Sequence, residues 1–202
     1  MTAIIDYDAG NIRSVCNALD RLGAEYSLTA DPQVILKADR VILPGVGNAA
    51  RAMESLREKN LCGLIRNLRI PVLGICVGMQ IMCLDSEEDN AVCLGIFDTH
   101  VRRFGAMKDA KVPHMGWNSI GNTESKLLKS LPKGSSVYFV HSYYPELCTD
   151  TVATCRHGDK LFSAALKYEN FYGTQFHPEK SGGCGETILR NFLSLWQTYC
   201  RQ

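Results

Sequence analysis

Short apolar runs alternate with amphipathic segments through the first half of the 202-residue chain. Four of these runs are predicted strands: residues 3–6, 25–29, 40–43 and 71–75. The first intervening segment predicts a helix, because apolar side chains at positions 12, 15, 16, 19 and 22 form one helical stripe. A second helix is expected to start near Asn48, and a third to cover 77–84. This alternation is typical of a parallel sheet with helices on both faces.

The second half of the chain changes to strand-like segments separated by short polar turns. These segments are residues 95–104, 112–119, 136–142, 150–157, 160–168 and 171–176. Helical spacing returns only in a patch at 125–130 and in a final helix over 185–200. No linker or repeat divides the halves, so we expect one domain over residues 1–202. The predicted fold class is α/β, a doubly wound, mostly parallel sheet with a mixed or antiparallel extension.

Composition and charge argue against several classes of protein. The formal net charge of +1 provides no basic field for nucleic acid. The longest nearly apolar stretch, 71–84, is shorter than the ~18 residues that a membrane span requires. Asp6 and Asp8 interrupt the N-terminal apolar run, so no signal peptide is expected. The nine cysteines form no C-x-x-C pair, and we expect no metal site, no disulfide framework and a cytoplasmic protein.

One cysteine stands in an unusual frame. Cys76 follows the predicted 71–75 strand, with Gly74 and Gly78 two positions away on either side. This G-x-nucleophile-x-G pattern is typical of a nucleophile elbow, in which a strained turn presents the side chain and the following N–H faces an oxyanion. On this motif alone, a buried cysteine in an ordinary strand-to-helix turn is an equally good interpretation.

A second motif supplies the partners that a thiol nucleophile needs. The strand at 171–176 delivers His177, and Pro178 favours extended backbone at that histidine. Glu179 is then expected on the same side of the chain as His177. Cysteine, base and carboxylate together make a catalytic triad. An isolated H-x-E would instead indicate a strand-end histidine paired with a local carboxylate.

Residues 44–47, PGVG, follow the third predicted strand. Their glycines allow a peptide N–H to turn toward an anion, although an ordinary turn has the same composition. The segment lacks the G-K-[ST] ending of a phosphate-binding loop. We therefore expect no nucleotide and no other cofactor.

Two motifs together resemble the class I glutamine amidotransferases: GICVGMQ at 74–80 and FHPE at 176–179. The likeness covers essentially the whole chain. Further segments look like the glutaminase subunits of imidazole glycerol phosphate synthase: DYDAGN at 6–11, PGVGNA at 44–49, PHMGWN at 113–118 and YFVHSYY at 138–144. The elbow departs from the usual pattern only at Val77, where leucine is commoner, and that position acts through its backbone.

The resemblance implies hydrolysis of glutamine to glutamate and ammonia. Cys76 would be the nucleophile, His177 the general base and acid, and Glu179 the residue that orients the histidine. The oxyanion hole would combine the N–H of Val77 with a donor from the loop that holds Val46 and Gly47. The glutamine pocket would include four residues: Gly47, Gln80, Ser142 and Tyr143.

The resemblance also implies a heterodimer with a (β/α)8-barrel cyclase, expected as a separate polypeptide. The cyclase would use the ammonia to make imidazole glycerol phosphate and aminoimidazole carboxamide ribonucleotide in histidine biosynthesis. Methionine and tryptophan are enriched at the centres of interfaces, although an edge strand with an inward tryptophan would give the same pattern. The implied interface residues are Asn11, Met115, Trp117 and Asn118.

Two other functions stay open. The chain could be another class I amidotransferase subunit, serving pyridoxal phosphate, aminobenzoate or nucleotide synthesis, or a catalytically silent regulatory module on the same fold. PHMGWN at 113–118 argues against the first. The presence of Cys76, His177 and Glu179 argues against the second.

Overall fold

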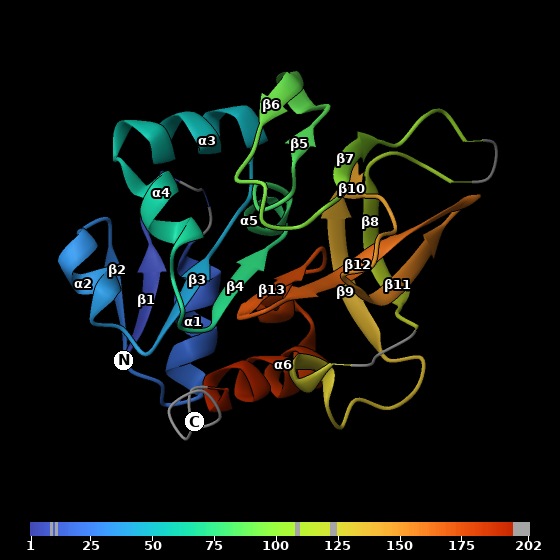
Figure 1. Ribbon diagram of the computed structural model, residues 1–202. Helices are drawn as coiled ribbons and strands as arrows, with labels where there is room; N and C mark the ends of the chain where they lie inside the picture. Colours follow the sequence, from blue (N-terminus) through green and yellow to red (C-terminus); the bar gives the residue numbers. More distant parts are fainter. Residues whose placement is uncertain (9, 11, 108–109, 122–124, 196–202) are drawn as a thin grey trace.

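A seven-stranded sheet forms the centre of the computed structural model, which describes residues 1–8, 10, 12–107, 110–121 and 125–195 (Figure 1). Across the sheet the strands are β11 (Thr151–His157), β12 (Lys160–Tyr168), β13 (Phe171–Thr174), β4 (Val72–Ile75), β3 (Arg40–Leu43), β1 (Thr2–Ile5) and β2 (Tyr26–Thr29). From β13 to β2 every neighbouring pair is parallel, whereas β12 and β11 continue the sheet in antiparallel pairs. The predicted parallel sheet with an antiparallel extension is confirmed.

Burial explains why the central strands read as continuous apolar runs. Every residue of β1, β4 and β13 is buried, as expected for parallel strands covered on both faces. The edge strand β2 has no buried residue. Because β3, β4 and β13 are parallel neighbours, their carboxyl ends lie together at one edge of the sheet. Ligands bind at this edge in open α/β folds.

Helices cover both sides of this sheet (Figure 1). In Figure 1, α3 (Ala49–Glu58) and α4 (Leu61–Arg66) lie on one side, and α1 (Ile12–Arg21) and α6 (Gly182–Ser194) lie on the other. The second helix starts where the sequence predicts, because the Asn48 side chain caps α3 by accepting from the N–H of Arg51 over 3.0 Å. No helix within the described ranges is both long and apolar enough to cross a membrane.

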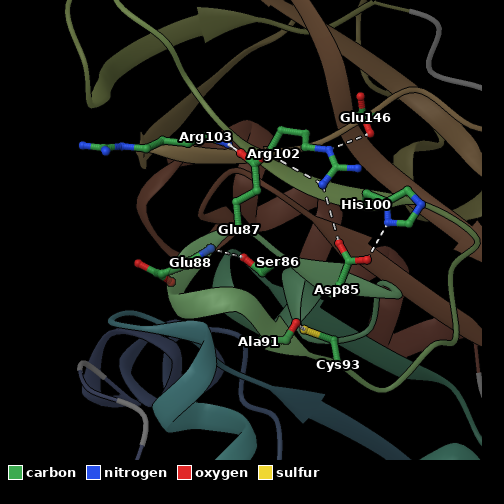
Figure 2. A network of polar contacts seen from close by, with 10 residues as sticks. All are labelled: Asp85, Ser86, Glu87, Glu88, Ala91, Cys93, His100, Arg102, Arg103 and Glu146. Atoms are coloured by element: carbon green, nitrogen blue, oxygen red, sulfur yellow. Dashed lines mark hydrogen bonds and ion pairs between the residues drawn. The ribbon is translucent and has the colours of Figure 1, made fainter.

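Two smaller sheets lie beside the central one. A two-stranded antiparallel ribbon joins β8 (His114–Ser119) to β9 (Ser136–His141). The other sheet contains β10 (Tyr143–Pro145), β7 (His100–Arg103), β5 (Asp85–Ser86) and β6 (Ala91–Val92). A polar network covers part of it (Figure 2), in which Arg102 pairs with Asp85, Glu87 and Glu146. These groups are partly exposed, so each pair adds little stability.

The predicted helix over 77–84 is too long. The structure has a single helical turn, α5 (Val77–Gln80), after which the chain turns toward β5. The carbonyl groups of Ile81, Met82 and Cys83 accept hydrogen bonds from residues 94–97 instead of continuing a helix. Backbone hydrogen bonds to residues 94–97 therefore override the helical propensity of residues 81–84. The apolar periodicity of 77–84 does not show this pairing.

Other boundaries also differ from the prediction. The final helix, α6, begins at Gly182 rather than at residue 185, and residues 196–200 of the predicted helix lie outside the described residues. The helix α2 (Pro32–Leu36) was not predicted, although Asp31 caps it and proline opens it. The strands β5, β6 and β10 have two or three residues each, too few to show alternation.

Three glycines allow the backbone to pack tightly around Cys76. A Cβ on Gly78 would lie 2.0 Å from the carbonyl oxygen of Leu43, and one on Gly45 would lie 2.3 Å from the nitrogen of Gly78. A Cβ on Gly74 would lie 2.6 Å from the carbonyl oxygen of Gly78. The glycines on either side of the cysteine are therefore required by contact between main chains.

We predict that Gly78→Ala lowers the free energy of unfolding by about 1–3 kcal/mol or more, because the new methyl group meets backbone rather than a flexible side chain. Denaturant unfolding measures the change. The matched control is Gly63→Ala in α4, where a Cβ meets nothing within 4 Å, and it should change stability by less than about 1 kcal/mol, in the stabilising direction. Equal effects of the two substitutions would contradict the packing explanation.

Candidate active site

Cys76 occupies a strained turn between β4 and α5. Its backbone has φ 53° and ψ −110°, a conformation that residues with a side chain rarely adopt. The surrounding chain holds it there. The N–H of Cys76 donates to the carbonyl of Thr174 over 2.7 Å, and its own carbonyl accepts from the N–H groups of Met79 and Gln80. The geometry is that of a nucleophile elbow.

His177 and Glu179 meet directly. His177 Nδ1 lies 2.8 Å from Glu179 Oε1, and the two side chains are only 1% and 2% exposed. The predicted extended backbone at His177 is confirmed, with φ −100° and ψ 97°, and Glu179 lies on the same side as the ring. Residues 178–180 form a short 3-10 helix that turns the carboxylate onto the ring. The Nε2 atom of His177 is buried without a hydrogen-bond partner among the described residues, and catalytic contacts are often incomplete before a substrate binds.

Charge at this site favours an imidazolium ring. Burial lowers the pKa of His177, but negative charge on Cys76 and the Glu179 carboxylate outweigh burial and raise the pKa to about 10. At neutral pH the His177 ring therefore holds a proton that it can give to a leaving group. Because α5 has only four residues, its helix dipole contributes little at this site.

Ser181 braces His177. Its hydroxyl donates to the carbonyl of His177 over 2.7 Å and accepts from the N–H of Tyr138 over 2.9 Å. The N–H of His177 donates in turn to the carbonyl of Tyr138 over 2.9 Å. This small loop ties the base to β9. Ser181 lies outside the two catalytic motifs, and nothing in the local sequence shows that its hydroxyl is buried.

Two further buried residues support the site and were not singled out in the sequence. The hydroxyl of Tyr7 donates to the carbonyl of Pro44 and so holds the loop that contains Val46. Burial, and to a lesser extent Cys76, raise the pKa of Tyr7 well above its usual range, so the hydroxyl stays protonated. Gln175 places its Nε2 3.5 Å from the sulfur of Cys76. Their motifs, DYDAGN and TQFHPE, are the signals that could have found them.

A cavity of about 510 Å³ opens in front of Cys76. It is lined by the residues expected for the oxyanion hole and for glutamine: Val46, Gly47, Val77, Gln80, Ser142 and Tyr143. Other lining residues are Glu88, Pro113, Val140, His141 and Lys180. Gly47 has φ 114°, a conformation that favours glycine, so this residue type is required where the loop borders the cavity.

The amide of Gln80 is held in a defined orientation. Its Nε2 donates to the carbonyl of Tyr143 over 2.9 Å and to Gln175 Oε1 over 3.0 Å. Both amide hydrogens are therefore used within the protein, which leaves the amide oxygen as the group that a ligand in the cavity can meet. Among the described residues, no group of three or more histidine, cysteine or acidic side chains is placed to hold a metal ion.

The residues expected at a partner interface do not share one face. Met115 and Trp117 are 63% and 59% exposed on the outer face of the β8–β9 ribbon. Asn118 points to the other face, where its Nδ2 donates to the carbonyl of Arg156 over 2.9 Å. Asn11 lies outside the described residues. Only Met115 and Trp117 are thus presented to solvent as the sequence suggested.

Comparisons with known proteins agree with this geometry. The family profile described as Glutamine amidotransferase class-I matches residues 3–196. The chain is 55% identical over 194 residues to imidazole glycerol phosphate synthase subunit HisH of Bacteroides thetaiotaomicron, which covers 96% of this chain and 98% of that protein. It is 45% identical over 196 residues to subunit HisH 2 of Legionella pneumophila, at 96% and 98% coverage.

Solved structures agree on the fold. A putative GMP synthase subunit from Thermoplasma acidophilum superposes with a TM-score of 0.76 over 99% of this chain and 95% of its own, at 22% identity. A cysteine elbow lies beside a buried His–Glu pair, and the family profile matches residues 3–196. The chain therefore belongs to the class I glutamine amidotransferases. Within that class it belongs to the family of imidazole glycerol phosphate synthase subunit HisH.

We predict that His177 is charged at neutral pH and that Cys76→Ala lowers its pKa, since the negative charge beside the ring is lost while burial and Glu179 remain. Titration of the ring by ¹⁵N NMR measures both values. Because the folded pKa exceeds the unfolded value of about 6.5, the protonated ring stabilises the fold fully below about pH 6.5, and this contribution is lost as pH rises through about 10. A ring that titrates near its unperturbed pKa in both proteins would contradict the assignment.

Proposed function

We propose that the chain is the glutaminase subunit of imidazole glycerol phosphate synthase in histidine biosynthesis. The observation that carries the proposal is the placement of the Cys76 elbow, which borders the cavity, beside the buried His177–Glu179 pair. The relatives named above, at 55% and 45% identity over nearly the whole chain, support the choice of pathway. The cytoplasm is the proposed compartment, since the eight cysteines among the described residues are free thiols.

The chemistry follows from the roles of three side chains. The Cys76 thiolate attacks the side-chain carboxamide carbon of glutamine, and the carbonyl oxygen becomes an oxyanion. His177 gives its proton to the departing nitrogen, so ammonia leaves and a thioester remains. Neutral His177 then takes a proton from water, which attacks the thioester and releases glutamate. Glu179 holds the ring through Nδ1 in both steps.

Backbone donors are proposed to stabilise the oxyanion. The N–H of Val77, next to the nucleophile in the elbow, is one donor. The second comes from the loop that carries Val46 and Gly47, which borders the same cavity. Gly45 and Gly47 flank Val46, and we propose that the peptide between Gly45 and Val46 rotates to complete the hole when a partner is loaded with its nucleotide.

Glutamine is proposed to lie against Gly47, Gln80, Ser142 and Tyr143. The oxygen of the Gln80 amide can accept a hydrogen bond from an N–H group of the substrate, because its nitrogen is committed to Tyr143 and Gln175. The cavity of about 510 Å³ is in the range of small-molecule sites.

A (β/α)8-barrel cyclase is proposed as the partner. The word subunit in the relatives' names points to a partner chain. Met115 and Trp117 expose large apolar side chains on β8. The rings of Trp117 and Tyr138 pack edge-to-face, with their centroids 6.0 Å apart. Large aromatic residues are favoured at the energetic centres of interfaces. Ammonia would pass directly to the cyclase, and so escape protonation in bulk water.

The decisive experiment mixes the purified chain with candidate barrel cyclases. We expect glutamate release to rise strongly when the cyclase nucleotide is added. A stable complex without this stimulation would indicate a different class I synthase as the partner. A complex that releases no glutamate and is not labelled at Cys76 by a glutamine-analogue electrophile would indicate a silent regulatory module.

We predict that Cys76→Ala abolishes glutamine-dependent synthesis, because no nucleophile remains to form the thioester. Ammonium salts supplied at high concentration should restore product formation by the same complex, since the cyclase no longer needs the glutaminase. Product assays with the two nitrogen sources give the measurement. Loss of both activities would show that the variant disturbs the complex rather than the chemistry.

We predict that Val46→Pro lowers partner-stimulated glutaminase turnover by about 10²–10³, the usual effect of one lost oxyanion donor. Proline removes the N–H that the rotation is proposed to supply. The matched control is Val46→Ala, which keeps the N–H and should retain most of the turnover. Full stimulation of Val46→Pro would show that another group is the second donor.

A further inference from the structure

Three histidines gather between β8, β9 and β11, and one of them, His141, lines the cavity. His114 and His141 are 4% and 6% exposed. The His114 ring stacks on His157 with ring centroids 4.1 Å apart, and Phe104, Phe139 and Phe162 pack around the group. None of these histidines belongs to the triad, and a buried polar group of this kind needs a full set of partners.

Hydrogen-bond partners determine the tautomer of each ring. His141 Nδ1 lies 2.7 Å from the carbonyl oxygen of Tyr143, which can only accept, so Nδ1 carries the proton and Nε2 of the neutral ring is an acceptor. His114 Nδ1, 3.1 Å from that acceptor, must therefore donate. His114 Nε2 is then an acceptor as well, and Asn118 Nδ2 donates to it over 3.1 Å.

The orientation of the Asn118 amide, at the start of this series of hydrogen bonds, is also fixed. Asn118 Nδ2 donates its other hydrogen to the carbonyl of Arg156 over 2.9 Å, and its Oδ1 accepts from the N–H of Ser119 over 2.8 Å. If the Asn118 amide were flipped, its oxygen would face the carbonyl oxygen of Arg156 and its nitrogen would face the N–H of Ser119. Two acceptors would then meet at one contact and two donors at the other. All donors therefore point one way, from Asn118 through His114 and His141 to the carbonyl of Tyr143.

That carbonyl connects the histidines to the candidate active site. The Tyr143 oxygen accepts from both His141 Nδ1 and Gln80 Nε2. Gln80 Nε2 also donates to Gln175 Oε1 over 3.0 Å, and Gln175 Nε2 lies 3.5 Å from the sulfur of Cys76. The contacts are continuous from β8, the strand that exposes Trp117, to the nucleophile.

We infer that His114 and His141 are positioning residues for glutamine: as a neutral, tautomer-locked pair they hold the Tyr143 carbonyl, and through it the Gln80 amide, in the orientation that receives the substrate. The inference rests on the proposed glutaminase function. Its members touch the pocket wall and not the reacting atoms, so they act on the binding of glutamine more than on the chemical step.

The surroundings of the pair keep it uncharged. Burial lowers the pKa of His114 to about 4, with a smaller contribution from His157. Burial also lowers the pKa of His141 to about 3, and His114, His157 and His177 act in the same direction against the opposing contact with Tyr143. Both rings consequently stay neutral across the physiological range, as the series of hydrogen bonds requires.

Substitutions at His141 provide the first test, made in the complex with its partner. His141→Leu removes the donor to Tyr143 and should raise the KM for glutamine by roughly three- to tenfold, the usual effect of one neutral hydrogen bond, with a smaller change in kcat. His141→Asn puts an amide N–H near the position of Nδ1 and should restore much of the affinity. Equal KM values for the two variants, at matched thermal stability, would overturn the inference.

The matched control is His157→Phe. It keeps an aromatic ring against His114, but His157 is not a member of the series and bonds instead to the carbonyl of Lys111. Its KM for glutamine should equal that of the unaltered chain. A rise as large as that of His141→Leu would show that packing of the cluster, rather than the hydrogen-bond series, sets the affinity.

A second measurement does not depend on activity or on the folding of a variant. In the unaltered chain labelled with ¹⁵N-histidine, His114 and His141 should both show the neutral Nδ1–H tautomer at about pH 6, where an unperturbed histidine is mostly charged. A charged ring or an Nε2–H tautomer would rule out the series. Because this readout is independent of catalysis, it separates failure of the inference from failure of the proposed glutaminase function.

Discussion

Close contact between main chains at the end of β4 is the constraint on which the site depends. The peptide units at Gly45, Gly74 and Gly78 approach so closely that none of them has room for a Cβ. This packing holds Cys76 in a conformation that it would not adopt alone, and it brings the loop with Val46 against the elbow. The position of the nucleophile and the shape of the oxyanion loop are therefore set by the same contacts.

The parallel pairing of β4 with β13 explains how two distant motifs meet. Ile75 pairs with Thr174, so Cys76 leaves β4 at the level where β13 ends. The hydrogen bond from Cys76 to the carbonyl of Thr174 fixes that register, and three residues later the chain delivers His177. One sheet edge thus supplies both nucleophile and base, as open α/β folds generally do.

Much of this arrangement could be predicted from the sequence, because the strands that matter are apolar runs and the motifs lie at their ends. The glycine frame pointed to the elbow, and FHPE pointed to its base. Glu179 lies on the same side as His177, as predicted. The short 3-10 helix that places it there could not be predicted, since a proline constrains the residue before it and does not specify a helix after it. Asn118 was grouped with Trp117 although strand alternation turns it to the opposite face. The motifs mark where Tyr7 and Gln175 lie, but the partners of the buried hydrogen bonds of Ser181, Gln175 and Tyr7 depend on tertiary packing.

The peptide groups of Tyr138 link the outer surface to His177, the proposed base. Its ring lies on the exposed face against Trp117, while its N–H and its carbonyl bond to Ser181 and His177. A compound seated on these two rings would therefore lie a single residue away from the base while remaining outside the glutamine cavity. Inhibitors built for this place would not need to resemble an amino acid, and they could discriminate this enzyme from amidotransferases that share its triad but have a different outer ribbon.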